Sequence, residues 1–183
     1  ADGLKYLGIP TVMGGSHVTF MAEEALEHCN YVARGEGHFT MLELVDALGD
    51  DASLSHISGL SFRRRDGSIV HNEDRRACSL AEFQALPWPD LSLIVGHDIM
   101  FTKPLMTQWG CPYNCDFCSV TALFGHRPRT KTPAQVIAEL DLLWARGWRG
   151  NVFFVDDNLL GGKAALKREL LPALIEWQRR HGL

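Results

Sequence analysis

Residues 105–118 read Leu-Met-Thr-Gln-Trp-Gly-Cys-Pro-Tyr-Asn-Cys-Asp-Phe-Cys: a short strand, residues 105–108, leads directly into a loop with three cysteines. Cys111, Cys115 and Cys118 are spaced as CxxxCxxC. Three soft thiolates at such short range are suited to zinc or to an iron–sulfur cluster. The stretch therefore predicts a metal-binding loop at the end of a strand.

The three thiols leave alternatives open. A structural zinc site needs four ligands, and His126 is the nearest candidate for the fourth, with His97 as another. An iron–sulfur cube held by three cysteines leaves one iron open, which is a catalytic arrangement. Three thiols without a metal are disfavoured, because clustered free cysteines oxidise. Cys29 and Cys78 are isolated in the sequence and are expected to be small core residues.

The chain after the loop continues as helix, strand and helix. Thr132-Pro133-Ala134-Gln135 supplies an N-cap, a proline at the first helical position and a glutamine that closes a capping box. Apolar residues then recur at helical spacing until Gly147. Residues 151–155 predict the next strand, and residues 164–180 a last helix that Pro172 kinks or restarts. This alternation predicts a parallel α/β sheet.

The first 48 residues show the same alternation with short connections. The expected elements occupy, in order, residues 2–7 (helix), 9–13 (buried strand), 22–29 (helix), 31–33 (strand) and 39–48 (helix). Two strands are too few to bury both faces of a sheet. We therefore expect the chain to be a piece of a longer protein.

A hairpin is expected between these two parts. Residues 49–58 are small and polar and mark a boundary. Two apolar runs, 60–62 and 68–70, flank the turn signal Asp66-Gly67 and predict a β-hairpin. The arginines at 63–65 read either as a nucleic-acid patch or as a solvated hairpin, and neighbouring acidic residues favour the second. The expected division is 1–50, 51–100 with the hairpin, and 101–183.

Composition excludes several classes of protein. The 183 residues are 46% hydrophobic and 22% charged, which excludes a disordered chain or a rod. The net charge of −4 argues against nucleic acid as a partner. No apolar run is long enough to span a bilayer, and no secretory signal is visible. Five cysteines, an odd number, do not fit a secreted disulfide framework, so a cytoplasmic protein without a transmembrane segment is expected.

Cys111, Cys115 and Cys118, with Phe117 before the last, resemble the signature of the radical S-adenosylmethionine (SAM) enzymes. The resemblance implies that the three thiolates hold a [4Fe–4S] cluster whose open iron chelates the methionine moiety of SAM. Reductive cleavage of SAM would then yield a 5′-deoxyadenosyl radical. Phe117 is implied to lie against the adenine.

Asp156-Asp157-Asn158 ends the second strand, where many members of this family carry Gly-Gly-Glu. The Asp-Asp form resembles the subgroup that couples the radical domain to a cobalamin-binding domain. The resemblance implies that Asp156 or Asp157 contacts the amino group of SAM, because barrel chemistry is placed at the C-terminal ends of strands. The alternative role for these carboxylates is capping the next helix.

The N-terminal third resembles the second half of the cobalamin-binding domain of that subgroup. Glycine loops at strand ends let the backbone approach a large ligand. His38 departs from the usual Gly-Glu-Gly-Glu, and His17 is expected to be an ordinary loop histidine rather than a cobalt ligand. The residues implied to line cobalamin are Gly14, Gly15, Gly35, Glu36 and Gly37.

The resemblance as a whole implies an α/β chain: the end of a flavodoxin-like (Rossmann-type) domain, a linker with a hairpin, and the first units of a partial (βα) barrel. It implies a [4Fe–4S], SAM- and cobalamin-dependent enzyme, possibly a methyltransferase on an unactivated carbon of a small-molecule or lipid-like substrate. A flavodoxin- or ferredoxin-type protein would donate the electron, and this segment alone would be inactive. The alternatives are a zinc-stabilised binding module and a radical SAM enzyme acting on RNA, which needs a basic appendage.

Overall fold

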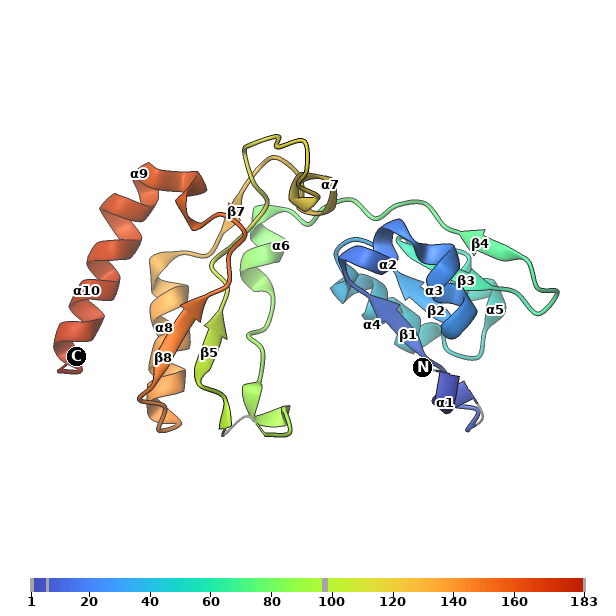
Figure 1. Cartoon of the computed structure of the whole chain (residues 1–183), viewed down its shortest axis with the longest axis horizontal. Helices are drawn as coiled ribbons and strands as arrows, with labels where there is room; N and C mark the ends of the chain where they lie inside the picture. The colour runs from blue at the N-terminus through green and yellow to red at the C-terminus, as the bar shows by residue number, and fades with distance from the viewer. Residues whose placement is uncertain (1, 6, 97–98, 183) are drawn as a thin grey trace. The chain divides into compact units, whose positions relative to one another are not determined.

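The computed structural model describes residues 2–5, 7–96 and 99–182, in two compact units that each mix helices and strands (Figure 1). The first unit holds Ala1–Ala77 and Ala122–Phe124, and the second holds Cys78–Thr121 and Gly125–Leu183. His97, one of the two histidines considered as a zinc ligand, lies outside the described residues. The expected α/β class is confirmed at this level.

The first unit is built on a sheet with the strand order β1-β2-β3-β4. β1 and β2 are parallel, whereas β3 is antiparallel to both β2 and β4. Its described elements are α1 (Asp2–Lys5), β1 (Val12–Gly14), α2 (Ser16–Phe20), α3 (Ala22–His28), β2 (Tyr31–Ala33), α4 (Gly37–Ala47), α5 (Asp51–Leu54), β3 (Leu60–Arg63) and β4 (Ile69–His71).

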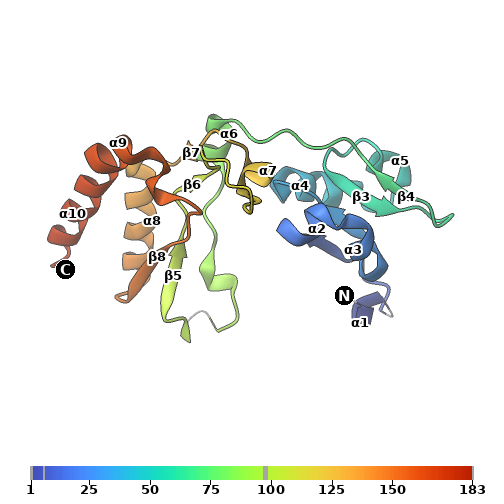
Figure 2. The same cartoon turned by 45° about the horizontal axis from the view of Figure 1, so that its top comes forward.

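Helices cover both faces of this sheet. The pair α2 and α3 lies on one face and the pair α4 and α5 on the other (Figure 2). Successive side chains of β2 point to opposite faces, so Val32 packs with Leu26 of α3, while Tyr31 packs against the cluster that contains Leu44 of α4 and Phe62 of β3. The predicted helix at 22–29 and strand at 31–33 are confirmed.

Three expectations for the first unit need correction. The hairpin does form, but its strands extend the sheet from two strands to four, and the sheet is mixed rather than purely parallel. The strand expected at 9–13 is shorter and is not buried, since Val12 keeps 37% of its surface exposed. The reason is that β1 stands at the edge of the described sheet and pairs with β2 on one side. Helix α2 was not expected.

The second unit contains two small sheets, in which β5 pairs with β8 in parallel and β6 pairs with β7 in antiparallel fashion. Its described elements are α6 (Leu80–Ala85), a 3-10 turn (Leu91–Leu93), β5 (Thr102–Leu105), β6 (Gln108–Trp109), β7 (Arg129–Thr130), α8 (Pro133–Ala145), β8 (Asn151–Phe154), a 3-10 turn (Leu159–Gly162), α9 (Lys163–Ala165), a π-helical turn (Leu166–Leu170) and α10 (Leu171–Arg180). Helix α7 (Val120–Phe124) is divided between the units, since Ala122–Phe124 belong to the first.

Helix α8 connects β5 to its parallel neighbour β8 and buries an apolar face against them. Leu105 of β5, Val136 and Leu140 of α8 and Trp177 of α10 form the core of this unit. The predicted capping box is confirmed: Thr132 Oγ1 accepts from the Gln135 N–H at 3.2 Å, and Gln135 Oε1 accepts from the Thr132 N–H at 2.9 Å. These bonds satisfy N–H groups that a helix start leaves free.

Two boundaries in the second unit differ from the sequence-based expectation. The strand expected at 105–108 begins at Thr102, ends at Leu105 and restarts as β6, because the chain changes pairing partner between them. The last helix contains a π-helical turn directly before Pro172, which occupies the first turn of α10. Among the described helices, none is both long enough and apolar enough to cross a membrane.

Replacing Thr132 by Ala removes the hydroxyl that receives the Gln135 N–H, so we expect the free energy of unfolding to fall by about 0.5–2 kcal/mol. Denaturant titration followed by circular dichroism measures this loss. Thr130→Ala, at an exposed position two residues earlier, should change it by no more than about 0.5 kcal/mol. Equal losses would contradict a stabilising capping box.

Candidate functional site

The cysteine loop leaves β6 through Gly110, whose φ of +87° lies in the region that favours glycine. The Cys111 N–H donates to the Gly125 carbonyl at 3.2 Å, and the Cys118 N–H donates to the Cys115 carbonyl at 3.0 Å. The Cys115 side chain is exposed, and Cys111 and Cys118 are partly exposed. The loop therefore presents three accessible thiols.

The number of donors in the loop bears on which metal it fits. A structural zinc site takes four ligands, whereas the loop offers three thiols. His126, the nearest proposed fourth ligand, is exposed. A cube of irons and sulfides spreads its ligands more widely than one ion does, and it accepts three thiolates. The donor set therefore fits the cluster.

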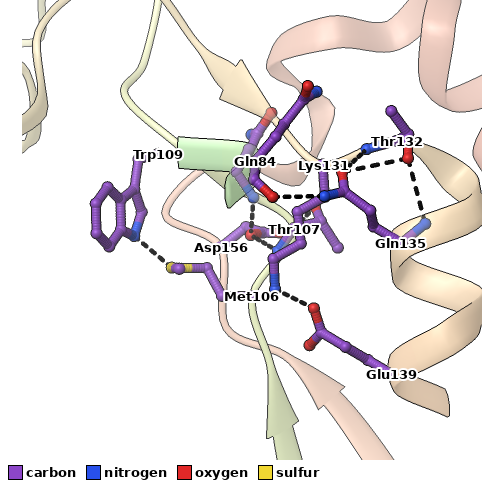
Figure 3. Close-up of polar contacts among 10 residues, drawn as sticks. Gln84, Met106, Thr107, Trp109, Lys131, Thr132, Gln135, Glu139 and Asp156 are labelled. Atoms are coloured by element: carbon purple, nitrogen blue, oxygen red, sulfur yellow. Dashed lines mark hydrogen bonds and ion pairs between the residues drawn. The ribbon is translucent and has the colours of Figure 1, made fainter. Parts of the chain in front are cut away.

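Asp156, just after β8, connects that strand to the segment between β5 and β6 (Figure 3). Its Oδ1 accepts from the Thr107 N–H at 2.6 Å and from the Gln108 N–H at 2.8 Å. Its Oδ2 accepts from the Thr107 hydroxyl at 2.6 Å. The carboxylate is therefore occupied with holding the chain that enters the cysteine loop.

Asp157 differs from its neighbour because its side chain is exposed. Desolvation by partial burial, followed by the charge of Asp156, raises the pKa of Asp157 above its ordinary value. An additional cation or hydrogen-bond donor nearby would stabilise this carboxylate. Phe117, in the cysteine loop, keeps 93% of its surface exposed, so its ring is accessible to a ligand.

Asn158 contacts the cysteine loop directly, which the sequence did not predict. Its Nδ2 donates to the Cys111 Sγ at 3.3 Å. Its carbonyl accepts from the Gly161 N–H at 3.0 Å and from the Gln108 side-chain amide. A sequence signal existed, since Asn158 follows two residues already singled out at the end of a strand.

The polar side chains near Thr107 pair with one another (Figure 3). Lys131, which is partly buried, forms an ion pair with the buried Glu139 of α8. The Lys131 N–H also donates to the Thr107 carbonyl at 2.8 Å. A cavity of about 180 Å³, lined by residues that include Gln108 and Leu159, adjoins these groups. The second unit thus has room for a ligand group beside the Asp156 segment.

In the first unit, the two glycine loops lie at the same edge of the sheet, because Gly14 of β1 is in register with Ala33 of the parallel β2. A Cβ on Gly15 or Gly35 would meet nothing within 4 Å, and both have positive φ, +105° and +68°. Thr19, which the sequence did not single out, links them. Its hydroxyl donates to the Gly15 carbonyl at 2.8 Å and accepts from the Gly35 N–H at 3.0 Å.

The remaining residues of the second glycine loop are less accessible. Glu36 is 6% exposed and occupies the N-cap position of α4. Gly37 begins that helix, and a Cβ there would contact the Ala33 Cβ at 3.6 Å. His17 lies in α2 rather than in a loop, and its Nε2 is 3.2 Å from the Glu24 carboxylate on an exposed surface.

Comparison with curated proteins finds clear relatives, although no protein-family model matches the chain. An uncharacterised methyltransferase of Synechocystis sp. is 51% identical over 178 residues, which are 97% of this chain and 30% of that protein. The hopanoid C-2 methylase of Rhodopseudomonas palustris is 34% identical over 175 residues, 95% of this chain and 30% of the methylase. The chain thus spans about a third of the length of these relatives.

Solved structures share the fold at lower sequence identity. OxsB, a cobalamin-dependent SAM radical enzyme with aqua-cobalamin and SAM bound, superposes with a TM-score of 0.70 at 19% identity, over 90% of this chain and 24% of OxsB. TsrM, a radical SAM methyltransferase from Kitasatospora setae with cobalamin and a [4Fe–4S] cluster bound, gives 0.64 at 20% identity, over 95% of this chain and 35% of TsrM.

Replacing Asp156 by Ala should lower the free energy of unfolding by at least about 2 kcal/mol, because two backbone N–H groups and a hydroxyl lose a charged acceptor. Asp157→Ala is the matched control and should change stability by no more than about 0.5 kcal/mol. Both are measured by denaturant titration. A loss at Asp157 as large as that at Asp156 would refute the different roles assigned to the two carboxylates.

Proposed function

The chain belongs to the family of B12-binding radical SAM enzymes, and we propose that it forms the part of such an enzyme that holds the [4Fe–4S] cluster and contacts SAM and cobalamin. The observation that carries the proposal is the contact between the CxxxCxxC loop and the residues that end β8, made by Asn158 and Cys111. This contact supports the proposal because it joins Cys111 to the segment that also carries the two carboxylates proposed for SAM.

The proposed cluster ligands are Cys111, Cys115 and Cys118. When bound at these residues, the cluster would supply the electron for reductive cleavage of SAM. The protein's part is to keep three cysteine side chains on one accessible loop, which Gly110 and the backbone bond from Cys111 to Gly125 orient. A zinc-stabilised module is not favoured, because the relatives are named as a methylase and a methyltransferase.

For SAM we propose contacts from Phe117 and Asp157, with Asp156 as their support. The exposed ring of Phe117 offers an apolar surface to the adenine. Asp157 has a raised pKa, and the ammonium of the methionine moiety would stabilise its charged form. Asp156 contributes by fixing the strand end from which Asp157 projects, through its bonds to Thr107 and Gln108.

For cobalamin we propose the edge of the first sheet formed by Gly14-Gly15 and Gly35-Glu36-Gly37. The space above Gly15 and Gly35 is open, and both loops follow parallel strands at one sheet edge, where α/β folds bind ligands. Glu36, in the second of these loops, is buried at the N-cap position of α4. The proposed division is 1–50 as part of a cobalamin-binding domain, 51–100 as a linker with a hairpin, and 101–183 as the start of a radical SAM barrel.

For the whole protein we propose methyl transfer to an unactivated carbon of a small-molecule or lipid-like substrate. Support comes from the relatives named as methyltransferases, including one named as a hopanoid methylase. A flavodoxin- or ferredoxin-type protein is the proposed electron donor, and the cytoplasm is the proposed location. An RNA substrate is not favoured, because the chain has a net charge of −4.

Cluster binding is tested by anaerobic reconstitution with iron and sulfide. We expect about four irons per chain, and each of Cys111→Ala, Cys115→Ala and Cys118→Ala should remove most of the iron. Addition of SAM to the reduced protein should change its electron paramagnetic resonance spectrum, since one iron remains open. Iron and sulfide analysis with this spectrum decides the outcome.

Cys29→Ala, Cys78→Ala and His126→Ala serve as controls and should retain the iron. Equal iron loss in Cys78→Ala and Cys111→Ala would contradict the assignment of the three loop cysteines as the ligands. Iron loss at His126, together with a spectrum that SAM leaves unchanged, would indicate a closed site with four ligands.

Cobalamin binding is tested with Gly15→Val in the protein encoded by the complete reading frame. A β-branched side chain would occupy the open space above the loop, so cobalamin retention in equilibrium dialysis should fall at least tenfold while iron content is unchanged. Gly67→Val, in the hairpin turn, is a matched control with a similar φ of +88° and open surroundings. No retained cobalamin, or equal retention by both variants, would refute the site.

A further inference from the structure

Asn158 is the only residue of the Asp156-Asp157-Asn158 segment for which the described structure gives a side-chain hydrogen bond to a cysteine of the loop. Its Nδ2 lies 3.3 Å from the Cys111 Sγ, and both residues are partly buried. The amide has to present its nitrogen here, because the carbonyl end of an asparagine would repel a thiolate. The contact thus directs a hydrogen-bond donor at a sulfur proposed as a cluster ligand.

The surroundings hold this amide in place. The Asn158 carbonyl receives hydrogen bonds from the Gly161 N–H and from the Gln108 side chain, so its backbone is fixed at two points. The next turn packs on the loop itself, since a Cβ on Gly161 would come within 3.3 Å of the Pro112 ring. Asn158 therefore sits between β6 and the first residues of the cysteine loop.

We propose that Asn158 is a positioning residue that raises the reduction potential of the cluster by donating a hydrogen bond to the thiolate of Cys111. The inference rests on the proposed cluster. Hydrogen bonds to ligand sulfurs tune cluster potentials. One-electron reduction adds negative charge to the cluster and its ligands, so a donor at the sulfur stabilises the reduced state more than the oxidised state.

The test is the midpoint potential of the reconstituted cluster, measured by redox titration with electron paramagnetic resonance. Asn158→Leu keeps the size of the side chain but removes the donor, and Asn158→Asp replaces the donor by a negative charge. We expect the potential to become more negative in both, and more so in the aspartate variant. Resonance Raman spectra should also show shifted Fe–S(Cys) stretching bands. Asn151→Leu, at the other end of β8, should change neither.

The possible outcomes separate this inference from the function on which it rests. A wild-type chain that takes up no iron overturns the proposed cluster. A wild-type chain that binds iron, with an unchanged potential and unchanged Raman bands in Asn158→Leu, overturns the role of Asn158 alone. If the leucine variant loses its cluster, Asn158→Asp decides, because a potential equal to or above that of the wild type contradicts the proposal.

Discussion

The hydrogen bonds that the Asp156 carboxylate accepts from Thr107 and Gln108 organise the second unit around the cysteine loop. The chain pairs with β8 up to Leu105 and with β7 from Gln108 onward, so its backbone changes partner at this point. Polar backbone groups at such a junction must be paired if they leave water. The carboxylate supplies that pairing, and the same bonds fix the direction in which the chain enters the loop.

Three consecutive side chains then serve three different purposes. Asp156 points to the chain that precedes the loop, Asp157 is exposed, and Asn158 reaches the sulfur of Cys111. Such a division follows from extended backbone at a strand end, where neighbouring side chains point in different directions. The three residues share one short segment, which the hydrogen bonds of Asp156 hold in place. The same bonds therefore fix both the position of Asp157 and the position of Asn158 beside the Cys111 sulfur.

Local signals were sufficient for part of this structure. The capping box at Thr132, the turn at Asp66-Gly67 and the strand that ends before Asp156 each depend on a few neighbouring residues, and each was predicted. Pairing between distant segments was not predicted. Joining of the hairpin to β2 and the contact from Asn158 to Cys111, 47 residues away, are set by tertiary packing, which residue spacing does not encode. The same holds for the edge position that exposes β1.

The hydroxyl of Thr19 limits which residues can occupy this position. The hydroxyl group donates to the Gly15 carbonyl and accepts from the Gly35 N–H, so a single side chain links two loops that are distant in sequence. Serine would preserve both bonds, whereas valine would preserve the shape and abolish both at once. A substitution at Thr19, which belongs to neither loop, would therefore remove a hydrogen bond from both.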